Sequence, residues 1–407
     1  MVELVGQSKE ELRGFCAGLG EPRYRGGQIY HALYAERKFN FARMTNLPAA
    51  LRERLQKESR ITLPEVKQRF ASSDGSVRYL FGLGTEEKRI NTKGTEKEST
   101  EDLVQNLNRA RTPASVEAVF MPSEGRQTIC ISTQAGCAVD CHFCLTARLG
   151  LIRNLTAGEI VGQVLVALEE HNSKSVAGTG ENHTKGGQKD ARRKPGATQT
   201  PDAIQTNVVL MGQGEPLLNF EPVMAALRIL LDPEGVGLSP KHVTLSTSGI
   251  LPGIERLAQE KVRPKLAISL NASNDEQRDA LMPINRKYPL SALMEACKNY
   301  PLRSWEHLTF EYVILGGVND TVEDARRVAR LVAPLKRVKV NLIPWNPGEL
   351  PYRESLPERI EEFRRILNDK GVPAFVRHSR GRDVMAACGQ LALLDVSKQS
   401  GLVSIAP

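Results

Sequence analysis

The sequence predicts an α/β protein: a partial, TIM-like (β/α)6 barrel with a small helical accessory domain at its N-terminus. Between residues 128 and 371, apolar segments of strand length alternate six times with longer segments whose apolar residues recur at helical spacing. Apolar strands joined by helices are typical of a parallel sheet that is covered on both faces. Six units are too few to close an eight-stranded barrel, so we expect an open barrel with its functional loops at the carboxyl ends of the strands.

The composition is that of an ordinary folded protein. The 407 residues are 41% hydrophobic and 25% charged, and the net charge of +8 is a weak indication of a polyanionic partner such as RNA. The first residues, MVELVGQSKEELRGF, lack the basic and apolar segments of a signal peptide, and no run of apolar residues is long enough to span a membrane. We therefore expect a cytoplasmic protein with no membrane partner.

Residues 1–62 are predicted to form the helical accessory domain. Ser8 and Glu11 have the spacing of a capping box, and RGGQIYHALY and LPAALRERLQKES carry apolar residues at helical spacing. Basic and aromatic residues interleave around RGGQIYHALY, which suits either an RNA-binding domain or a plain helical bundle with solvated charges. These residues are Arg23, Tyr24, Arg25, Tyr30, His31, Tyr34 and Arg37. We expect the RNA-binding domain because of the motifs that follow in the chain.

The chain from residue 63 onward is predicted to contain a linker, the barrel and two irregular segments. Residues 63–115 read as a hairpin that turns at Asp74-Gly75, followed by a polar, flexible linker. A second hairpin, SVEAVFMP and QTICISTQ, leads into the barrel, which we place at 116–395. Within it, residues 172–205 have the Gly, Lys, Thr and Pro content of a disordered insertion, and residues 396–407 are expected to be a C-terminal tail.

A loop with three cysteines follows the first barrel strand. In QAGCAVDCHFCLTARLG, Cys137, Cys141 and Cys144 have the spacing Cys-x-x-x-Cys-x-x-Cys. Three thiolates on a short loop can bind three irons of a cubane iron–sulfur cluster and leave the fourth iron open. A structural zinc site with His142 as fourth ligand is the alternative, although zinc sites prefer paired Cys-x-x-Cys motifs and four closed ligands.

Polar residues and glycines also follow the later strands. In GQGEP, Gly214 lets a ligand approach the backbone closely, and the carboxylate of Glu215 can bind an amino group. We expect further ligand contacts at the ends of the third, fourth and sixth strands, although each of these residues could equally cap a helix or shape a turn. They are Ser246, Ser269, Leu270, Asn271 and Asn346.

Three more residues are candidates for catalysis. Cys130 shares its strand face with Thr128 and so is not placed like a core residue. Glu117 lies in the apolar strand SVEAVF, where a carboxylate needs a partner or a purpose unless it is at a solvated strand edge. Cys388 lies in the segment AACG, whose small residues suggest an exposed loop, with a buried core cysteine as the alternative.

Together these motifs resemble the RlmN/Cfr family of radical S-adenosylmethionine (SAM) RNA methyltransferases. The resemblance covers nearly the whole chain and rests on QAGCAVDCHFC, RNLTAGEIVGQV, GQGEPLLN, VTLSTSG, LAISLNA, LIPWNP and RGRDVMAACGQL. The last motif is the discriminating one, because most radical SAM enzymes lack a methyl-carrying cysteine. Ala147 follows Thr146 where the family usually has glycine, and Asn271 stands where a histidine is common.

The resemblance implies cofactors, partners and a reaction. It implies a [4Fe–4S] cluster on the three loop cysteines and two SAM molecules per turnover, bound at the strand ends named above. It implies RNA substrates and an electron donor such as flavodoxin or ferredoxin, and we expect a monomer. The RlmN branch methylates C2 of an adenosine in 23S rRNA and, in many members, the adenosine next to the tRNA anticodon, whereas the Cfr branch methylates C8.

The resemblance also implies roles for the three candidate catalytic residues. One SAM methylates Cys388, and a second, reduced through the cluster, yields the radical that activates this methyl group for addition to the adenine. Cys130 then attacks the sulfur of Cys388, which releases the product and leaves a Cys130–Cys388 disulfide. Either Glu117 or Cys130 removes the ring proton. Two other classes stay open: a non-catalytic zinc-containing RNA-binding module, and another radical SAM class such as a glycyl-radical activator, which would not need Cys388.

Overall fold

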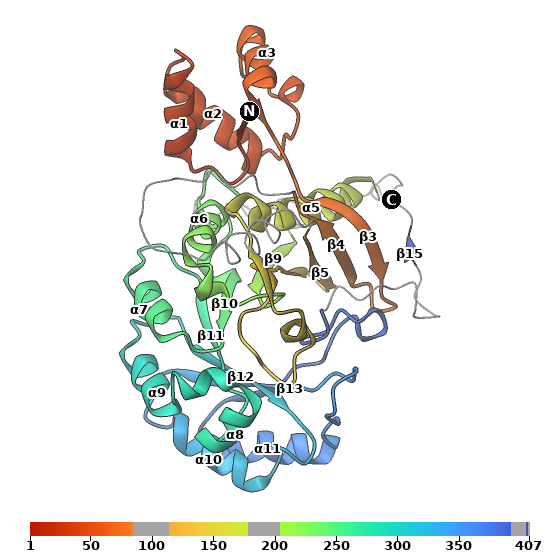
Figure 1. Cartoon of the computed structure of the whole chain (residues 1–407), viewed down its shortest axis with the longest axis vertical. Coiled ribbons are helices and arrows are strands. Elements are labelled where there is room, and N and C mark those ends of the chain that lie inside the picture. The colour runs from red at the N-terminus through yellow and green to blue at the C-terminus, as the bar shows by residue number, and fades with distance from the viewer. Residues whose placement is uncertain (85–113, 178–203, 392–403, 406–407) are drawn as a thin grey trace, which may run out of the picture.

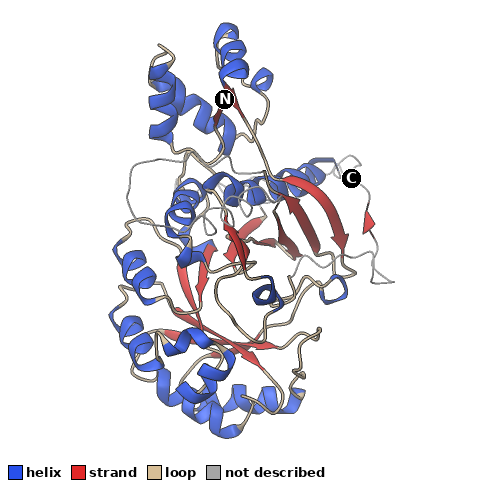
Figure 2. Cartoon of the chain, in the orientation of Figure 1, coloured by secondary structure: helices blue, strands red, loops and turns tan. Residues whose placement is uncertain are grey.

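One twisted sheet of eleven strands organises the chain (Figures 1 and 2). The structure, a computed structural model, describes residues 1–84, 114–177, 204–391 and 404–405. Seven neighbouring strands are parallel. In sheet order they are β6 (Arg126–Cys130), β9 (Gln205–Leu210), β10 (Val243–Thr247), β11 (Lys265–Ser269), β12 (Leu308–Ile314), β13 (Val338–Pro344) and β14 (Ala374–Val376).

Helices cover the outer face of these parallel strands, and the main apolar core lies between the two layers (Figure 1). They are α5 (Ala157–Ala177), α6 (Phe220–Leu231), α7 (Leu251–Gln259), α8 (Asp275–Leu281), α9 (Leu290–Asn299), α10 (Val322–Val332) and α11 (Pro357–Asp369). The six predicted β/α units are all present, so the open-barrel prediction is confirmed. The short helix α8 and the strand β14 were not predicted as separate elements.

The two hairpins extend the barrel sheet with antiparallel strands. Next to β6 come β5 (Ser115–Ser123), β4 (Val77–Gly82), β3 (Glu65–Ala71) and β15 (Ser404–Ile405). The hairpin that was grouped with a linker is therefore part of the barrel sheet, and the last described residues of the predicted tail return to it.

Two of the segments predicted to be irregular lie largely outside the described residues. The expected flexible stretch of the linker, 85–113, is one of them. The expected insertion, 172–205, is described only at its ends, where α5 continues to Ala177 and β9 begins at Gln205.

The N-terminal residues form a helical domain at one end of the barrel (Figure 1). Its helices are α1 (Lys9–Gly18), α2 (Tyr24–Tyr34) and α3 (Ala49–Glu58), and the pair β1 (Val2–Glu3) and β2 (Ser59–Arg60) joins its two ends. The predicted capping box is present, with the Ser8 backbone N–H donating to Glu11 Oε2 at 2.7 Å. Gly6 has φ +95°, and a Cβ there would lie 2.4 Å from the backbone N of Gly158, so this loop packs directly on α5.

The RNA-binding interpretation of the interleaved aromatic residues is wrong for two of the three tyrosines. Tyr30 and Tyr34 are buried in the core of the structure. The Tyr30 hydroxyl donates to Asp232 Oδ2 at 3.0 Å, and Asp232 follows α6 in the barrel. Tyr30 therefore links the helical domain to the barrel. The Tyr34 hydroxyl instead bonds within the helical domain, accepting from Gly6 N at 2.9 Å and donating to Gln7 O at 3.1 Å. Of the three tyrosines only Tyr24 is exposed.

None of the helices within the described ranges is long and apolar enough to cross a membrane.

Candidate active site

The three-cysteine loop lies at the carboxyl end of β6. It is framed by an antiparallel pair, β7 (Gln134–Gly136) and β8 (Leu151–Asn154), so it begins and ends at the same place. Gly136 has φ +73°, and a Cβ there would lie 1.9 Å from the carbonyl oxygen of Gly150. Only glycine allows this closure, which the Cys137 N–H completes by donating to Gly150 O at 3.0 Å.

The thiols of Cys137, Cys141 and Cys144 line one cavity of about 170 Å³. Burial raises the pKa of Cys137 to about 12 and that of Cys141 well above its usual value. A bound metal cluster would reverse this preference, because thiols lose their protons on binding metal.

The arrangement of these thiols fits a cluster better than a single ion. No group of three His, Cys, Asp or Glu side chains in the described part of the chain converges as ligands of one metal ion would. Three cysteines that each bind a different iron are spread around the cluster instead. Three thiols that line one cavity are the donor set that an iron–sulfur cluster with one open iron needs.

Gly214 and Glu215 form the wall of this cavity next to the thiols. Gly214 has φ +98°, and a Cβ there would meet Gln134 Cβ at 2.5 Å. The Glu215 carboxylate is buried and accepts from Ser248 N at 2.7 Å, Ser248 Oγ at 2.8 Å and Leu217 N at 3.1 Å. Burial raises its pKa and these hydrogen bonds oppose the shift, so the carboxylate is fixed in orientation beside the cavity.

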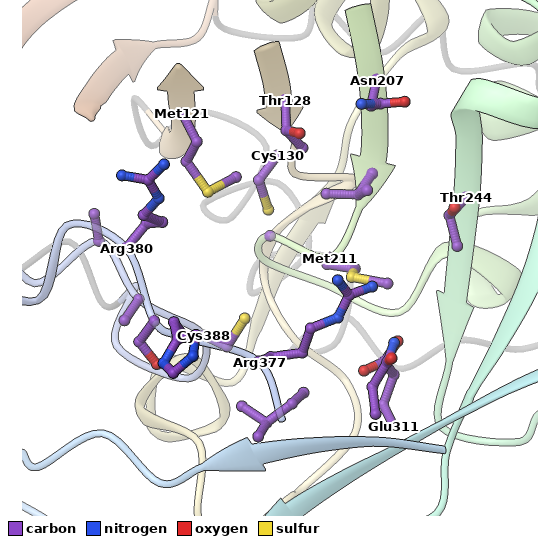
Figure 3. Close-up of a pocket in the computed structure, with 18 of the residues that line it drawn as sticks. Met121, Thr128, Cys130, Asn207, Met211, Thr244, Glu311, Arg377, Arg380 and Cys388 are labelled. Carbon is purple, nitrogen blue, oxygen red and sulfur yellow. The ribbon is translucent and has the colours of Figure 1, made fainter. Parts of the chain in front are cut away.

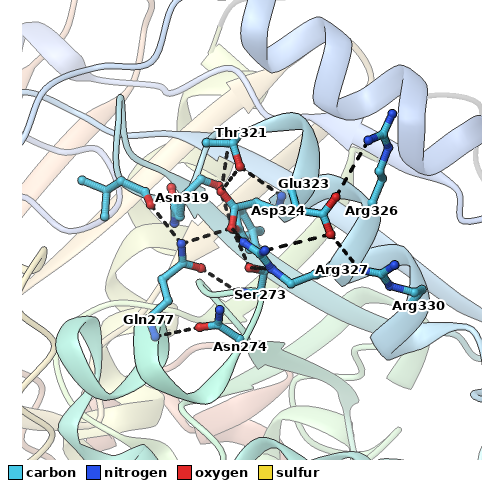
Figure 4. Close-up of polar contacts among 12 residues, drawn as sticks. Ser273, Asn274, Gln277, Asn319, Thr321, Glu323, Asp324, Arg326, Arg327 and Arg330 are labelled. Atoms are coloured by element: carbon cyan, nitrogen blue, oxygen red, sulfur yellow. Dashed lines mark hydrogen bonds and ion pairs between the residues drawn. The ribbon is translucent and has the colours of Figure 1, made fainter.

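Three more of the predicted contacts line the same cavity: Ser246, Ser269 and Asn271. Asn271 has φ +55°, a left-handed conformation that asparagine tolerates. Its Oδ1 accepts from Val313 N at 2.8 Å, and its own carbonyl accepts from Asn319 Nδ2 at 2.8 Å. Hydrogen bonds around Asn319, Thr321 and Asp324 support the backbone at this strand end (Figure 4).

Leu270 and Asn346 do not line this cavity. The Leu270 side chain lies in the apolar core, and its carbonyl accepts from Arg278 Nε at 3.1 Å. Asn346 Nδ2 instead donates to the carbonyl of Cys388 at 3.2 Å. Both residues support the rim from outside the cavity in this structure.

The loop that carries Cys388 is held from two sides. On one side the Leu145 N–H of the three-cysteine loop donates to Gly389 O at 2.8 Å. On the other side Asp383 accepts from Ser72 Oγ at 2.6 Å and from Ser73 N at 2.9 Å, in the turn between β3 and β4. The hairpin therefore positions Cys388 over the barrel mouth.

A larger cavity of about 610 Å³ runs through the open barrel, and both Cys130 and Cys388 line it. Their side chains point toward one another from opposite walls (Figure 3). The surrounding protein raises the pKa of both thiols, that of Cys388 to about 11, although Cys388 is exposed to the cavity. All seven cysteines are free thiols, so the Cys130–Cys388 disulfide implied by the resemblance is absent from this structure.

Glu117 is 2% exposed, so it is not a strand-edge residue in solvent. Its Oε1 pairs with Arg78 Nη1 at 2.9 Å, and Arg78 is equally buried. Glu117 lines neither of the two cavities in this state, although Gln213 links it to the loop before Gly214.

Replacing Arg78 with methionine is expected to lower the free energy of unfolding by about 3–5 kcal/mol, because it removes the cation paired with a buried carboxylate. Denaturant titration measures this loss. The double variant Arg78→Met/Glu117→Gln should recover much of it, and Arg60→Met, which breaks an exposed pair with Glu3, should have little effect. Equal losses in Arg78→Met and Arg60→Met would contradict this assignment.

The sequence interpretation missed three residues that project into the larger cavity: Glu311, Asn341 and Arg377. The sequence did contain a signal that could have identified Glu311. Glu311 lies in LTFEYVIL, a carboxylate within an apolar strand, which is the same pattern that singled out Glu117.

An open (β/α)6 barrel with three loop thiols at the carboxyl end of its first strand defines a radical SAM enzyme. In agreement, residues 199–332 match the Radical SAM superfamily and residues 2–61 match the ribosomal RNA large subunit methyltransferase N-terminal domain. The crystal structure of a radical SAM methyltransferase from Sphaerobacter thermophilus superposes with a TM-score of 0.78 at 36% identity, covering 96% of this chain and 99% of that one.

Relatives over nearly the full length identify the family. The chain is 44% identical to a probable dual-specificity RNA methyltransferase RlmN of Koribacter versatilis, covering 92% of this chain and 96% of the relative. It is 42% identical to the dual-specificity RNA methyltransferase RlmN of Anaeromyxobacter dehalogenans, covering 96% and 91%. The chain belongs to the RlmN family of radical SAM RNA methyltransferases, whose cofactors are a [4Fe–4S] cluster and SAM.

Proposed function

We propose that the protein methylates C2 of an adenosine in 23S rRNA and of the adenosine next to the anticodon in tRNA, with Cys388 as the methyl carrier. The observation that carries this proposal is the pair of thiols, Cys130 and Cys388, that face each other in a cavity beside the three-cysteine site. A carrier cysteine needs a second thiol within reach to release the product. The RlmN relatives are named dual-specificity RNA methyltransferases, which supports two RNA substrates.

In this proposal the residues of the smaller cavity hold the cofactors. Cys137, Cys141 and Cys144 bind the cluster, and Glu215 binds the amino group of SAM with Gly214 giving close backbone approach. Hydroxyl and amide groups of Ser246, Ser269 and Asn271 contact the rest of SAM, while Leu270 and Asn346 support that rim. The cluster and SAM supply the radical that activates the methyl group.

The remaining steps belong to side chains of the larger cavity. Cys388 presents the methyl group to the base from a loop that is exposed to the cavity. The Cys130 thiolate attacks the Cys388 sulfur, so that a sulfur–sulfur bond forms while the bond from that sulfur to the carbon attached to the base breaks. That carbon takes up a proton, and the base leaves with its methyl group. Glu117 or Cys130 takes the ring proton; Cys130 lines the cavity already, whereas Glu117 first has to leave its pair with Arg78.

Mass spectrometry of the modified nucleoside tests this proposal. Anaerobically reconstituted enzyme, SAM, a reducing system and an RNA fragment carrying the target adenosine should yield 2-methyladenosine. Formation of 8-methyladenosine would place the reaction with the Cfr branch, and the absence of any methylated adenosine would overturn the proposal.

The larger cavity carries a basic group of residues that suits an RNA substrate. Lys265, Lys339 and Arg377 line it together, and burial and the neighbouring cations lower the pKa of Lys265 and Lys339. A polyanion that enters here relieves this mutual repulsion. We therefore place the RNA backbone on this side of the barrel.

Charge reversal at Lys265 is expected to weaken RNA binding. Lys265→Glu should raise the Kd by about tenfold and reduce the slope of log K against log salt by roughly one or more. Fluorescence anisotropy over a salt series measures both quantities. Lys261→Glu makes the same charge change at an exposed position that lines neither cavity and should have little effect; equal losses in the two variants would remove Lys265 from the RNA site.

A further inference from the structure

Glu311 on β12 and Asn341 on β13 form a buried polar pair in the barrel. They are register partners on neighbouring parallel strands, and both side chains line the larger cavity. Asn341 Nδ2 donates to Glu311 Oε1 at 2.8 Å. Asn341 is 2% exposed and Glu311 is 7% exposed, so the pair is largely shielded from solvent.

One atom of this pair lacks a hydrogen-bond partner. Asn341 Oδ1 is buried and accepts no hydrogen bond from any of the residues that the structure describes. An unsatisfied buried acceptor is unfavourable by about 1–3 kcal/mol, and native structures rarely retain one without a reason. A ligand that donates a hydrogen to this oxygen would remove the penalty.

The position of the pair points to the RNA substrate as that ligand. Glu311 lines both cavities, whereas Asn341 lines only the larger one, away from the three-cysteine site. Glu311 extends into the same cavity as Cys388 (Figure 3). The pair therefore lies where the methyl group is transferred.

The hydrogen-bonding capacity of the pair matches one nucleobase edge. A protonated carboxyl offers one donor, and the asparagine oxygen offers one acceptor. Burial raises the pKa of Glu311, which favours the protonated form, while Asn341, Arg377 and Lys339 act in the opposite direction. The Watson–Crick edge of adenine has an acceptor at N1 and a donor at the N6 amino group, whereas guanine has these two roles reversed.

We propose that Glu311 and Asn341 recognise the target adenine, with Glu311 donating to N1 and Asn341 Oδ1 accepting from the N6 amino group. Enzymes that modify a base commonly read its Watson–Crick edge in a pocket after taking it out of the stack. C2 is bonded to N1, so this contact places C2 near Glu311 and Cys388, while C8 lies at the other end of the purine. The inference rests on the proposed function and assigns its base specificity to two residues.

A cycle of protein and RNA variants tests this assignment. Asn341→Ala should lower kcat/KM on an adenosine-containing RNA by about 10- to 100-fold, but should cause little further loss on the same RNA with purine riboside, which lacks the N6 amino group. Glu311→Leu should show the same non-additivity with 1-deazaadenosine, which lacks N1. Glu311→Gln keeps an N–H donor and should retain more activity than Glu311→Leu.

Controls separate base recognition from a structural role. Thr244→Val changes a residue of the same cavity on β10 and should leave the ratio between the RNAs unchanged (Figure 3). Equal losses on all RNAs together with weaker SAM binding would place Glu311 in the SAM site and overturn the inference. The wild-type protein tests it even if a variant fails to fold, because it must prefer adenosine to purine riboside by about tenfold or more.

The outcome also distinguishes this inference from the proposed function. Wild-type enzyme that forms 2-methyladenosine but shows additive losses in both cycles would refute only the roles of Glu311 and Asn341. Wild-type enzyme that methylates no adenosine would refute both.

Discussion

Cys388→Ala is expected to reduce RNA methylation by at least about 10³-fold, because the variant has no sulfur to carry the methyl group. Cys388 lies on a loop fixed by Asp383 and Gly389, with its side chain exposed to the cavity, so alanine removes the thiol without removing the contacts that place the loop. The assay is quantification of methylated nucleoside by mass spectrometry after anaerobic turnover.

The mass of the protein distinguishes a missing carrier from a damaged site. Wild-type enzyme incubated with SAM should gain one methyl group on Cys388, and Cys388→Ala should gain none. Cys130→Ala should still gain it, because Cys130 acts only after the methyl group has been loaded onto Cys388. Cys16→Ala changes a buried cysteine of α1, far from the cavity in the fold, and should keep both loading and turnover. Normal yield from Cys388→Ala would end the carrier-cysteine scheme.

The barrel could be predicted because its signals are local. Each β/α unit shows a short apolar segment and then a segment with helical periodicity, and both can be read within a single stretch of chain. The pairing of β4 with β5 could not be predicted, because it joins strands separated by the polar segment 85–113 and depends on contacts distant in sequence. The first hairpin, β3 and β4, was therefore grouped with a linker.

The tyrosines of α2 show how composition can mislead where periodicity would not. Tyr30 and Tyr34 are four residues apart, so they share one face of the helix. Ile29 and Leu33 have the same spacing and are also buried. Helical spacing would have assigned both tyrosines to the core, whereas their alternation with basic residues suggested RNA contacts.

In the candidate site, too, features contained in one stretch of sequence could be predicted, whereas features that depend on distant contacts could not. The three-cysteine loop and the GQGEP segment are each one short, continuous stretch of sequence, so each could be recognised as a candidate binding segment. The structure brings the two together in one cavity wall. The place of Cys388 depends on the contact between Asp383 and Ser72, residues from opposite ends of the chain, and spacing carries no information about it. Glu311 was missed although its sequence pattern matched that of Glu117.

Loss of one cluster ligand is the second change with a large expected effect. Cys141→Ala should abolish methylation, by at least about 10³-fold, and should lower the iron bound after reconstitution from about four per chain. Cys141 is the middle one of the three thiols that line the cavity, and alanine leaves one corner of the cluster without a protein ligand. Absorbance of the brown cluster and iron analysis measure the loss directly.

Cys297→Ala is the control, because it also removes one thiol, but from a buried cysteine of α9 that lines neither cavity. It should keep the cluster absorbance, the iron content and the activity. Colourless wild-type protein with one zinc per chain would instead support a closed metal site. Retention of about four iron atoms by Cys141→Ala would show that the loop thiols do not each hold a corner of the cluster, and the open iron that binds SAM would then have to lie elsewhere.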